Sequence, residues 1–150
     1  MSSHAARGAY LLLVTVAADR DVEVGALGTI RFERGTYVYV GSAMGGLEQR
    51  VGRHLRRDKR MRWHIDRLLD ASDRVEALLV PSRIDMECEL ASLVEGIPGA
   101  VGIRHFGCSD CRCRSHLFRV SERIAACLRS SFPEPLRRVS GVSAGRQDGR

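Results

Sequence analysis

The sequence has little that would direct the chain into or through a membrane. The apolar run around Leu11–Val14 is far shorter than the roughly 20 residues that a bilayer-spanning helix needs. The segment 1–7 lacks the apolar core and the small-residue cleavage site of a secretory signal. We therefore expect a cytoplasmic protein that has no membrane partner.

Asparagine is absent, and Lys59 is the only lysine among 24 basic residues. Such a preference for arginine is typical of a GC-rich genome, so the net charge of +6 says little by itself. The positions of the basic residues along the sequence are more informative. Between Arg50 and Arg62 there are seven basic residues and one acid, an excess equal to the net charge of the whole chain. This concentration favours a nucleic acid as partner, and a solvated helix face is the alternative.

The chain has five cysteines, and this odd number favours reduced thiols over a disulfide framework. Three of the five cysteines form the pattern Cys-x-x-Cys-x-Cys-x-x-His, made of Cys108, Cys111, Cys113 and His116. Zinc can take four such ligands. Because the ligands are crowded and no second pair follows, we favour a structural loop beside a functional cleft over a zinc site.

The length of 150 residues suits one domain, expected over 1–132, with a disordered basic tail over 133–150. Strands are predicted at Ala9–Val16, Thr29–Phe32, Thr36–Val40, Val75–Val80 and Ser115–Val120, with the second and third joined in a hairpin and a further strand before Phe106. Helices are predicted at Leu47–Arg57, Trp63–Leu69, Met86–Val94 with Asp85 as its N-cap, and Ile124–Leu128. These elements indicate an α+β fold.

A tyrosine, a glycine-rich segment and a basic helix follow one another in the sequence. Tyr39 leads into Gly41–Gly46, and the helix after it carries Arg50 and His54 four positions apart, on one side. Cleavage of a phosphodiester needs a group that takes a proton from water, a cation on the phosphate oxygens and stabilisation of the leaving oxygen. A tyrosine, an arginine and a carboxylate that holds Mg²⁺ can supply these, and Glu87 is the candidate carboxylate.

These motifs resemble the core of the GIY-YIG nucleases. The motifs are Gly8-Ala9-Tyr10, Tyr39-Val40-Gly41-Ser42 and Arg50-x-x-x-His54, together with Gly35–Ala43, Trp63–Asp66, Glu87–Ala91 and Ser109–Phe118. The resemblance extends in particular to a branch of that superfamily that is sometimes fused to a DNA glycosylase of the helix-hairpin-helix type. It implies a GIY-YIG-like fold, with a small, mainly antiparallel central sheet flanked by helices.

Three features depart from the family pattern. Ala9 stands in the first motif where the family name has isoleucine, a small change on a strand. Tyr39 comes 29 positions after Tyr10, a wider spacing than usual, and the strand at 29–32 can account for the extra length. The asparagine that the wider superfamily often carries near its site is absent, and Ser109, Asp110 or His116 can stand in for it.

The resemblance implies a metal-dependent DNA endonuclease that acts in DNA repair or processing. The implied catalytic residues are Tyr10, Tyr39, Arg50, His54 and His64. Tyr39 would be the general base or would orient the attacking water, and Arg50 would hold the scissile phosphate. Glu87 would bind one Mg²⁺ or Mn²⁺ ion, weakly without DNA, with Glu89 as the second candidate.

The basic residues expected to bind DNA are Arg53, Arg57, Lys59, Arg60 and Arg62. RNA is the alternative substrate, and the fused branch suggests a repair enzyme as partner. Other interpretations stay open. Glu87 can simply complement a helix dipole, and His64 can be a buried hydrogen-bonding residue. The protein can be a non-catalytic nucleic-acid-binding module or a zinc-stabilised protein-interaction domain.

Overall fold

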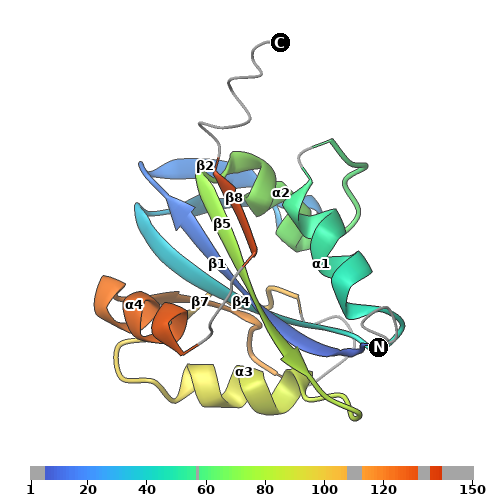
Figure 1. Cartoon of the computed structure of the whole chain (residues 1–150). Coiled ribbons are helices and arrows are strands. Elements are labelled where there is room, and N and C mark those ends of the chain that lie inside the picture. Colours follow the sequence, from blue (N-terminus) through green and yellow to red (C-terminus); the bar gives the residue numbers. More distant parts are fainter. Residues whose placement is uncertain (1–5, 57, 108–112, 132–135, 140–150) are drawn as a thin grey trace.

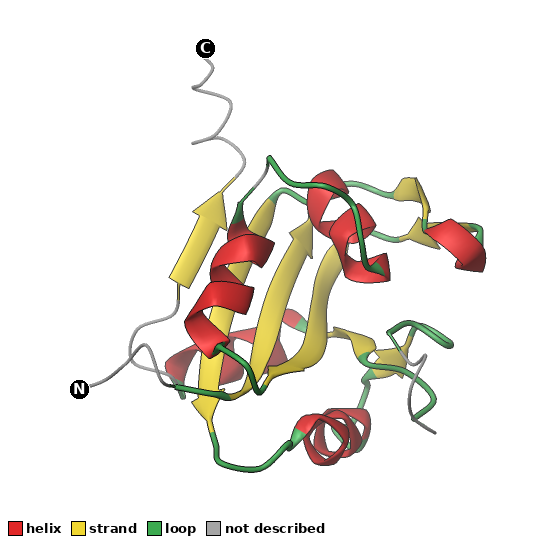
Figure 2. Cartoon of the chain, turned by 90° about the vertical axis from the view of Figure 1, so that its right-hand side faces the viewer, coloured by secondary structure: helices red, strands yellow, loops and turns green. Residues whose placement is uncertain are grey.

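Strand β1 (Gly8–Val16) lies at the centre of a six-stranded sheet. The computed structural model describes residues 6–56, 58–107, 113–131 and 136–139. β1 pairs antiparallel with β4 (Gly35–Ala43) on one side and with β5 (Arg74–Pro81) on the other. The remaining strands are β6 (Val101–Gly102), β7 (Leu117–Val120) and β8 (Leu136–Val139). The order is β6-β7-β4-β1-β5-β8, with every pair antiparallel (Figure 2).

Helices cover both faces of this sheet (Figure 1). The first pair is α1 (Leu47–Leu55) and α2 (His64–Ala71), and the second pair, on the other face, is α3 (Glu87–Glu95) and α4 (Glu122–Ser130). Because side chains alternate along β1, Leu12 packs with the first pair and Leu13 with the second. The predicted α+β fold, an antiparallel sheet flanked by helices, is confirmed.

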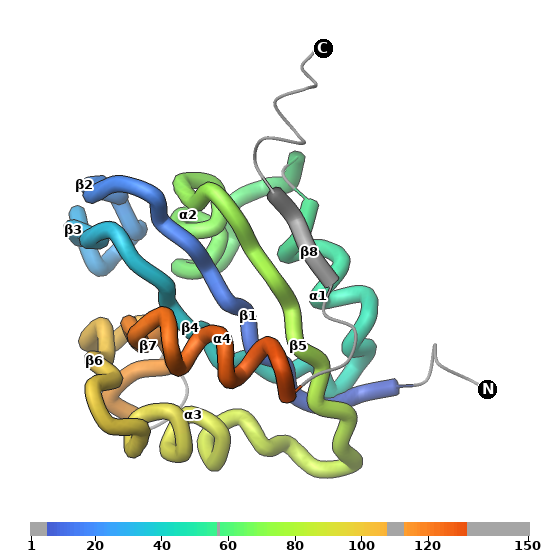
Figure 3. The backbone as a smooth tube through the Cα atoms, turned by 60° about the vertical axis from the view of Figure 1, so that its left-hand side comes forward, coloured from blue at the N-terminus to red at the C-terminus, as the bar shows by residue number. Residues whose placement is uncertain are grey.

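The predicted hairpin between 29–32 and the next strand is wrong. β3 (Thr29–Phe32) pairs instead with β2 (Arg20–Glu23), which the sequence did not predict, in a separate two-stranded sheet (Figure 3). Both edges of β4 are taken, since β1 pairs with one and β7 with the other. The β2–β3 hairpin and its short 3-10 turn Gly25–Leu27 fill the extra length between the two tyrosines.

The predicted helices form, with shifted ends. α1 ends at Leu55, two residues before the predicted end, and Lys59 Nζ donates to the backbone oxygens of His54 and Arg56 just there. The N-cap of α3 is Met86 rather than the predicted Asp85, because the helix begins one residue later than expected, although Asp85 accepts the backbone N–H of Glu87 at 3.0 Å. Among the described residues, no helix combines the length and the apolar character that a membrane span requires.

Strand β8 falls in the segment that was expected to be disordered. Leu136–Val139 pairs antiparallel with β5, so the expectation is wrong for these residues and the folded region extends past 132. The available edge of β5, opposite β1, provides the hydrogen-bonding partners for this strand. The rest of the predicted tail, 133–135 and 140–150, lies outside the described residues.

Candidate active site

Tyr10 and His54 form a buried polar pair on the face of the sheet that α1 covers. The Tyr10 hydroxyl and His54 Nε2 share a hydrogen bond of 2.7 Å. Gly41 lies opposite Tyr10 on β4, and a Cβ there would come 2.4 Å from the Tyr10 hydroxyl. Glycine at position 41 therefore lets the Tyr10 ring cross the neighbouring strand and reach α1.

Burial determines the charge state of this pair. Desolvation, helped by the nearby Lys59, Arg53 and Arg50 cations and opposed by Asp66, lowers the pKa of His54 to about 3, so the imidazole is neutral at pH 7. His54 Nδ1 is buried and has no hydrogen-bond partner among the described residues. Desolvation also raises the pKa of Tyr10, against the opposing effect of Arg50. The pair is thus neutral overall, and one hydrogen bond joins its two groups.

Tyr39 lies one aromatic ring away from this pair. Its ring centroid is 6.5 Å from that of Tyr10 and 6.4 Å from that of His54, and Phe106 packs on it at 6.3 Å. The side chain is only partly buried, unlike that of Tyr10. Desolvation and the neighbouring Tyr10 and Glu87 raise the pKa of Tyr39 well above its usual value, while Arg50 opposes the rise. Tyr39 is therefore a neutral phenol whose pKa responds to the negative Glu87 and to the positive Arg50.

Ser42, at the end of β4, joins Arg50 to Glu87. Arg50 Nη1 donates to the backbone oxygen of Ser42 at 3.2 Å, and the Ser42 hydroxyl donates to Glu87 Oε1 at 2.9 Å. The other carboxylate oxygen of Glu87 lies 2.7 Å from His116 Nδ1. The sequence predicted Arg50 and Glu87, but it did not indicate Ser42 as the residue that connects them.

Four predicted side chains therefore meet at one end of the β1–β4 pair: Tyr10, Tyr39, Arg50 and Glu87, with His54 directly behind Tyr10. Glu89, the second candidate acid, is exposed on α3. His64 packs against Phe106, with ring centroids 5.8 Å apart, and its ring makes no hydrogen bond among the described residues. His64 thus lies beside the site rather than in its polar chain.

The Arg53 side chain makes its ion pair within the fold rather than at the surface. It binds the fully buried Asp66 through two hydrogen bonds of 2.9 Å, and Asp66 also accepts the backbone N–H groups of Arg62 and Trp63. Burial opposes the charge on Asp66, but these hydrogen bonds outweigh it and lower the pKa of the carboxyl. Contrary to the expectation that it binds DNA, Arg53 is committed to Asp66, the residue that closes the Trp63–Asp66 motif.

Other members of the expected DNA surface have different positions. Lys59 caps α1 through two backbone oxygens and is only partly exposed. Arg60 and Arg62 are exposed, and Arg57 lies outside the described residues. Trp63 carries the guanidinium groups of Arg50, Arg53 and Arg62 over its ring at 4.4 to 5.2 Å from the centroid. The indole thereby holds Arg50 close to Ser42.

The cysteine-rich segment is described in part. Cys108, Cys111, Ser109 and Asp110 lie outside the described residues, whereas Cys113 and His116 are placed next to Cys88 of α3. The cysteine pattern that suggested a zinc site does not include Cys88, because Cys88 lies 25 positions before Cys113. Of the three residues considered in place of the missing asparagine, His116 contacts Glu87.

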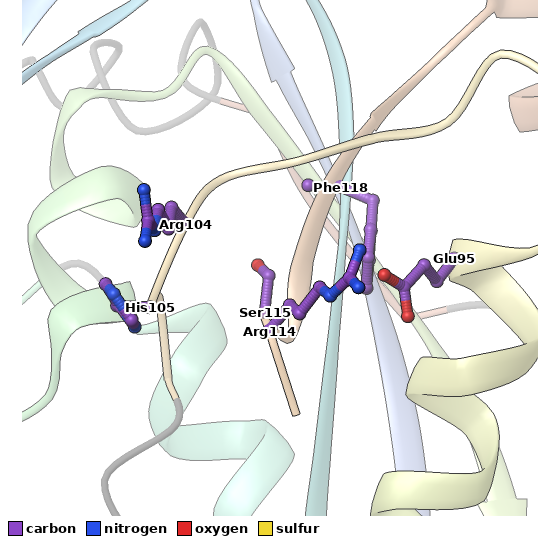
Figure 4. A pocket seen from close by; sticks show the side chains of 7 residues that line it. Glu95, Arg104, His105, Arg114, Ser115 and Phe118 are labelled. Carbon is purple, nitrogen blue, oxygen red and sulfur yellow. The ribbon is translucent and has the colours of Figure 1, made fainter. Parts of the chain in front are cut away.

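A pocket of about 520 Å³ lies apart from these residues, between the end of α3 and the segment before β7. Figure 4 shows Arg104 and His105 on one side of it and Glu95 on the other, with Arg114 between them. None of its described lining residues belongs to the predicted catalytic set. The pocket is therefore a separate feature of the surface.

Comparison with known proteins gives one match. No curated protein and no solved structure matches the chain. A family model described as "Domain of unknown function DUF123" matches residues 9–136, which run from β1 to the first residue of β8. This range covers most of the chain, and the protein therefore belongs to the family Domain of unknown function DUF123.

Proposed function

We propose that the protein is a metal-dependent endonuclease of the GIY-YIG type that hydrolyses DNA in repair or processing. The main support is the meeting of Arg50 and Glu87 at Ser42, beside the two tyrosines. An arginine and a carboxylate joined through Ser42, with a phenol beside them, are the groups that phosphodiester hydrolysis needs. The resemblance of the motifs to the GIY-YIG nucleases, and to the branch fused to DNA glycosylases, adds to this support.

Tyr39 is the group for the attacking water. As a neutral phenol it can accept a hydrogen bond from that water and orient it towards the phosphorus atom. Arg50 already lowers the pKa of Tyr39 in part, and a divalent cation would lower it further. Removal of the water's proton by Tyr39 therefore requires the metal-bound state. Tyr39 would take that proton only as a phenolate, after its own proton has passed to solvent. Tyr10 and His54 form a neutral hydrogen-bonded pair behind it.

Arg50 is the group for the phosphate. One of its nitrogens donates to Ser42, and the remaining N–H donors of the guanidinium can bind the phosphate oxygens. The stacking on Trp63 fixes the side chain before substrate binds, so little conformational entropy is lost in the bound complex.

Glu87 is the group for the metal. Its side chain is 25% exposed, and each carboxylate oxygen has one partner and a second lone pair, which fits a weak Mg²⁺ site completed by water and substrate phosphate. The ion would stabilise the charge on the leaving oxygen. The exposed Arg60 and Arg62 extend the positive surface for the DNA backbone.

The test is cleavage of nicked, branched, single-stranded and duplex DNA, with an RNA of the same sequence, in Mg²⁺ or Mn²⁺ and in chelator. Glu87→Gln keeps size and hydrogen bonding but removes the charge, so it should bind DNA and fail to cut it. Glu89→Gln is the matched control on the same helix and should cut like the wild type. A dead Glu89→Gln with an active Glu87→Gln would move the metal site to Glu89.

Two results would overturn the proposal. If both variants cut normally, the single-metal mechanism is wrong. If the wild type binds DNA in a salt-dependent way and cuts no substrate in either metal, the protein is a nucleic-acid-binding module that kept the fold and the basic helix.

A further inference from the structure

Cys88, Cys113 and His116 come together from two separate parts of the chain. Cys88 lies in the first turn of α3, and the other two precede β7. One ligand atom from each residue lies within 4.8 Å of the others. The cluster runs from the exposed Cys88 through the partly buried Cys113 to the fully buried His116. Such a gradient lets an ion enter from solvent and contact a buried ligand.

We propose that these three residues bind one Zn²⁺ ion. Two thiolates and an imidazole are ligands that zinc prefers, and hard cations such as Mg²⁺ take oxygen instead. With Zn–S bonds of about 2.3 Å and Zn–N bonds of about 2.0 Å, tetrahedral ligand atoms lie about 3.5 to 3.8 Å apart. The observed separations thus need to close by about 1.3 Å at most, a shift that side-chain rotation can provide. Among the described residues three supply ligands, which leaves the fourth position to water or another ligand.

The partners of His116 suit a metal ligand. Its Nδ1 lies 2.7 Å from Glu87 Oε2, so coordination through Nε2 would create the carboxylate–histidine–zinc arrangement common in zinc proteins. The backbone N–H of His116 donates to Phe106 at 2.9 Å, and its oxygen accepts from Val40 at 2.8 Å. The imidazole is therefore held at both backbone groups and at one ring nitrogen before any ion binds.

The zinc ion would fix the first turn of α3 to the segment before β7. Glu87, next to Cys88, lies at this junction and also accepts from Ser42. The ion would thereby hold the carboxylate that the proposed nuclease needs for Mg²⁺. The zinc inference rests on the ligand cluster alone, however, and it stands even if the protein cuts no DNA.

Zinc binding is measured on the full chain, purified in a phosphine reductant, without DNA. After loading with zinc and desalting, the metal content should be one ion per chain in the wild type and in Cys127→Ser, an exposed cysteine of α4 that serves as control. Cys88→Ser and Cys113→Ser should bind zinc more than 10²-fold more weakly in competition with a chromophoric chelator. Wild-type affinity in Cys88→Ser, or no zinc in the wild-type chain, would overturn the inference.

The neighbouring carboxylate gives a graded test. Glu87→Gln should weaken zinc about 10- to 100-fold, the usual effect of changing a group that hydrogen-bonds a ligand. Glu89→Gln should leave the affinity unchanged. Because zinc is measured without DNA, a wild-type chain that binds zinc and cuts no DNA would overturn the nuclease proposal alone, and one that cuts DNA and binds no zinc would overturn the zinc inference alone.

Alkylation of the wild-type protein needs no variant and so avoids the risk of misfolding. Iodoacetamide should modify Cys88 and Cys127 in the metal-free protein, since both side chains are exposed. Zinc should protect Cys88 and leave Cys127 reactive, as read by mass spectrometry. Equal modification of Cys88 with and without zinc would show that Cys88 is not a ligand.

Discussion

The two faces of the central strands differ sharply in chemistry although they alternate along the same residues. Towards α3 and α4, β1 and β4 present Leu11, Leu13, Val38 and Val40, in an apolar cluster. Towards α1 and α2 the same strands present Tyr10 and Tyr39, which meet a buried histidine. The face towards α3 and α4 buries a charged group, Glu76, which is paired with Arg129 of α4, and the other face buries the neutral pair of Tyr10 and His54.

Burial of polar groups has an energetic cost on the second face. His54 stays neutral because burial lowers its pKa, and its Nδ1 lacks a partner among the described residues. An unpaired buried polar atom costs about 1 to 3 kcal/mol. Proteins keep such costs where function needs the groups. We therefore expect a change at Leu13 to affect stability and a change at Tyr39 to affect the proposed chemistry.

The largest effect on stability should come from the apolar face. Leu13 is fully buried, so Leu13→Ala should lower the free energy of unfolding by about 2 to 5 kcal/mol through lost contacts and a residual cavity. Tyr39→Phe keeps the ring contacts and should change it by less than about 1 kcal/mol while cleavage falls. Urea denaturation and the nuclease assay measure the two quantities.

Leu93, a leucine of α3 that is 67% exposed, provides the control. Leu93→Ala should change the unfolding free energy by about 0.5 kcal/mol or less. If Tyr39→Phe destabilises the protein as much as Leu13→Ala does, the two faces do not divide stability and chemistry in this way.

A smaller effect is the pH dependence that His54 creates. Its pKa is about 3 in the folded protein and about 6.5 when unfolded. As pH falls through 6.5 the unfolded chain takes up a proton that the native protein refuses, so stability decreases towards pH 3. By pH 5 the loss is about 2 kcal/mol relative to pH 7.5. Denaturation at several pH values measures it.

His54→Phe should remove this component of the pH slope, whatever it does to stability at pH 7.5. His105 is exposed and has a positive φ of 64°, which asparagine tolerates, so His105→Asn is a suitable control and should keep the wild-type slope. An unchanged slope in His54→Phe would mean that His54 is not held neutral by burial.

The smallest effect concerns the exposed arginines at the edge of the polar face. Arg60→Ala and Arg62→Ala should each reduce the slope of log affinity for duplex DNA against log salt by about 1. Arg53→Ala should instead unfold the protein more easily, since it leaves Asp66 buried without its cation. Salt titrations of DNA binding distinguish the two kinds of arginine, and equal slopes in all three variants would contradict this division.

The sequence predicts the parts of this fold that follow from local periodicity. Alternation in β4 places Tyr37 and Tyr39 on one face, and Tyr37 is a core residue whose hydroxyl donates to the backbone oxygen of Glu33. Strand pairing is less predictable, because it depends on which edges other strands occupy. β3 pairs with β2 because β1 and β7 already occupy both edges of β4. The four residues Leu136–Val139 form β8 at the edge of β5.

The candidate site shows the same limit. Motifs identified Arg50 and Glu87, but spacing cannot show that Ser42 bridges them or that Cys88 lies beside His116. Arg53 shows a second limit, in which the sequence groups residues that the structure separates. In the sequence it is one of many arginines in a basic segment, and only its tertiary contact with Asp66 distinguishes it from the surface ones.

The most direct test of the account is the double comparison of Arg50→Ala with Arg123→Ala. Arg50 belongs to the polar face, whereas Arg123 is an exposed arginine of α4 on the opposite side of the sheet. Cleavage of the best DNA substrate and the free energy of unfolding are measured for both variants. We expect Arg50→Ala to lower cleavage by on the order of 10²-fold or more at an unfolding cost of about 1 kcal/mol, and Arg123→Ala to change neither. Wild-type turnover in Arg50→Ala would contradict the claim that this face of the sheet cuts DNA.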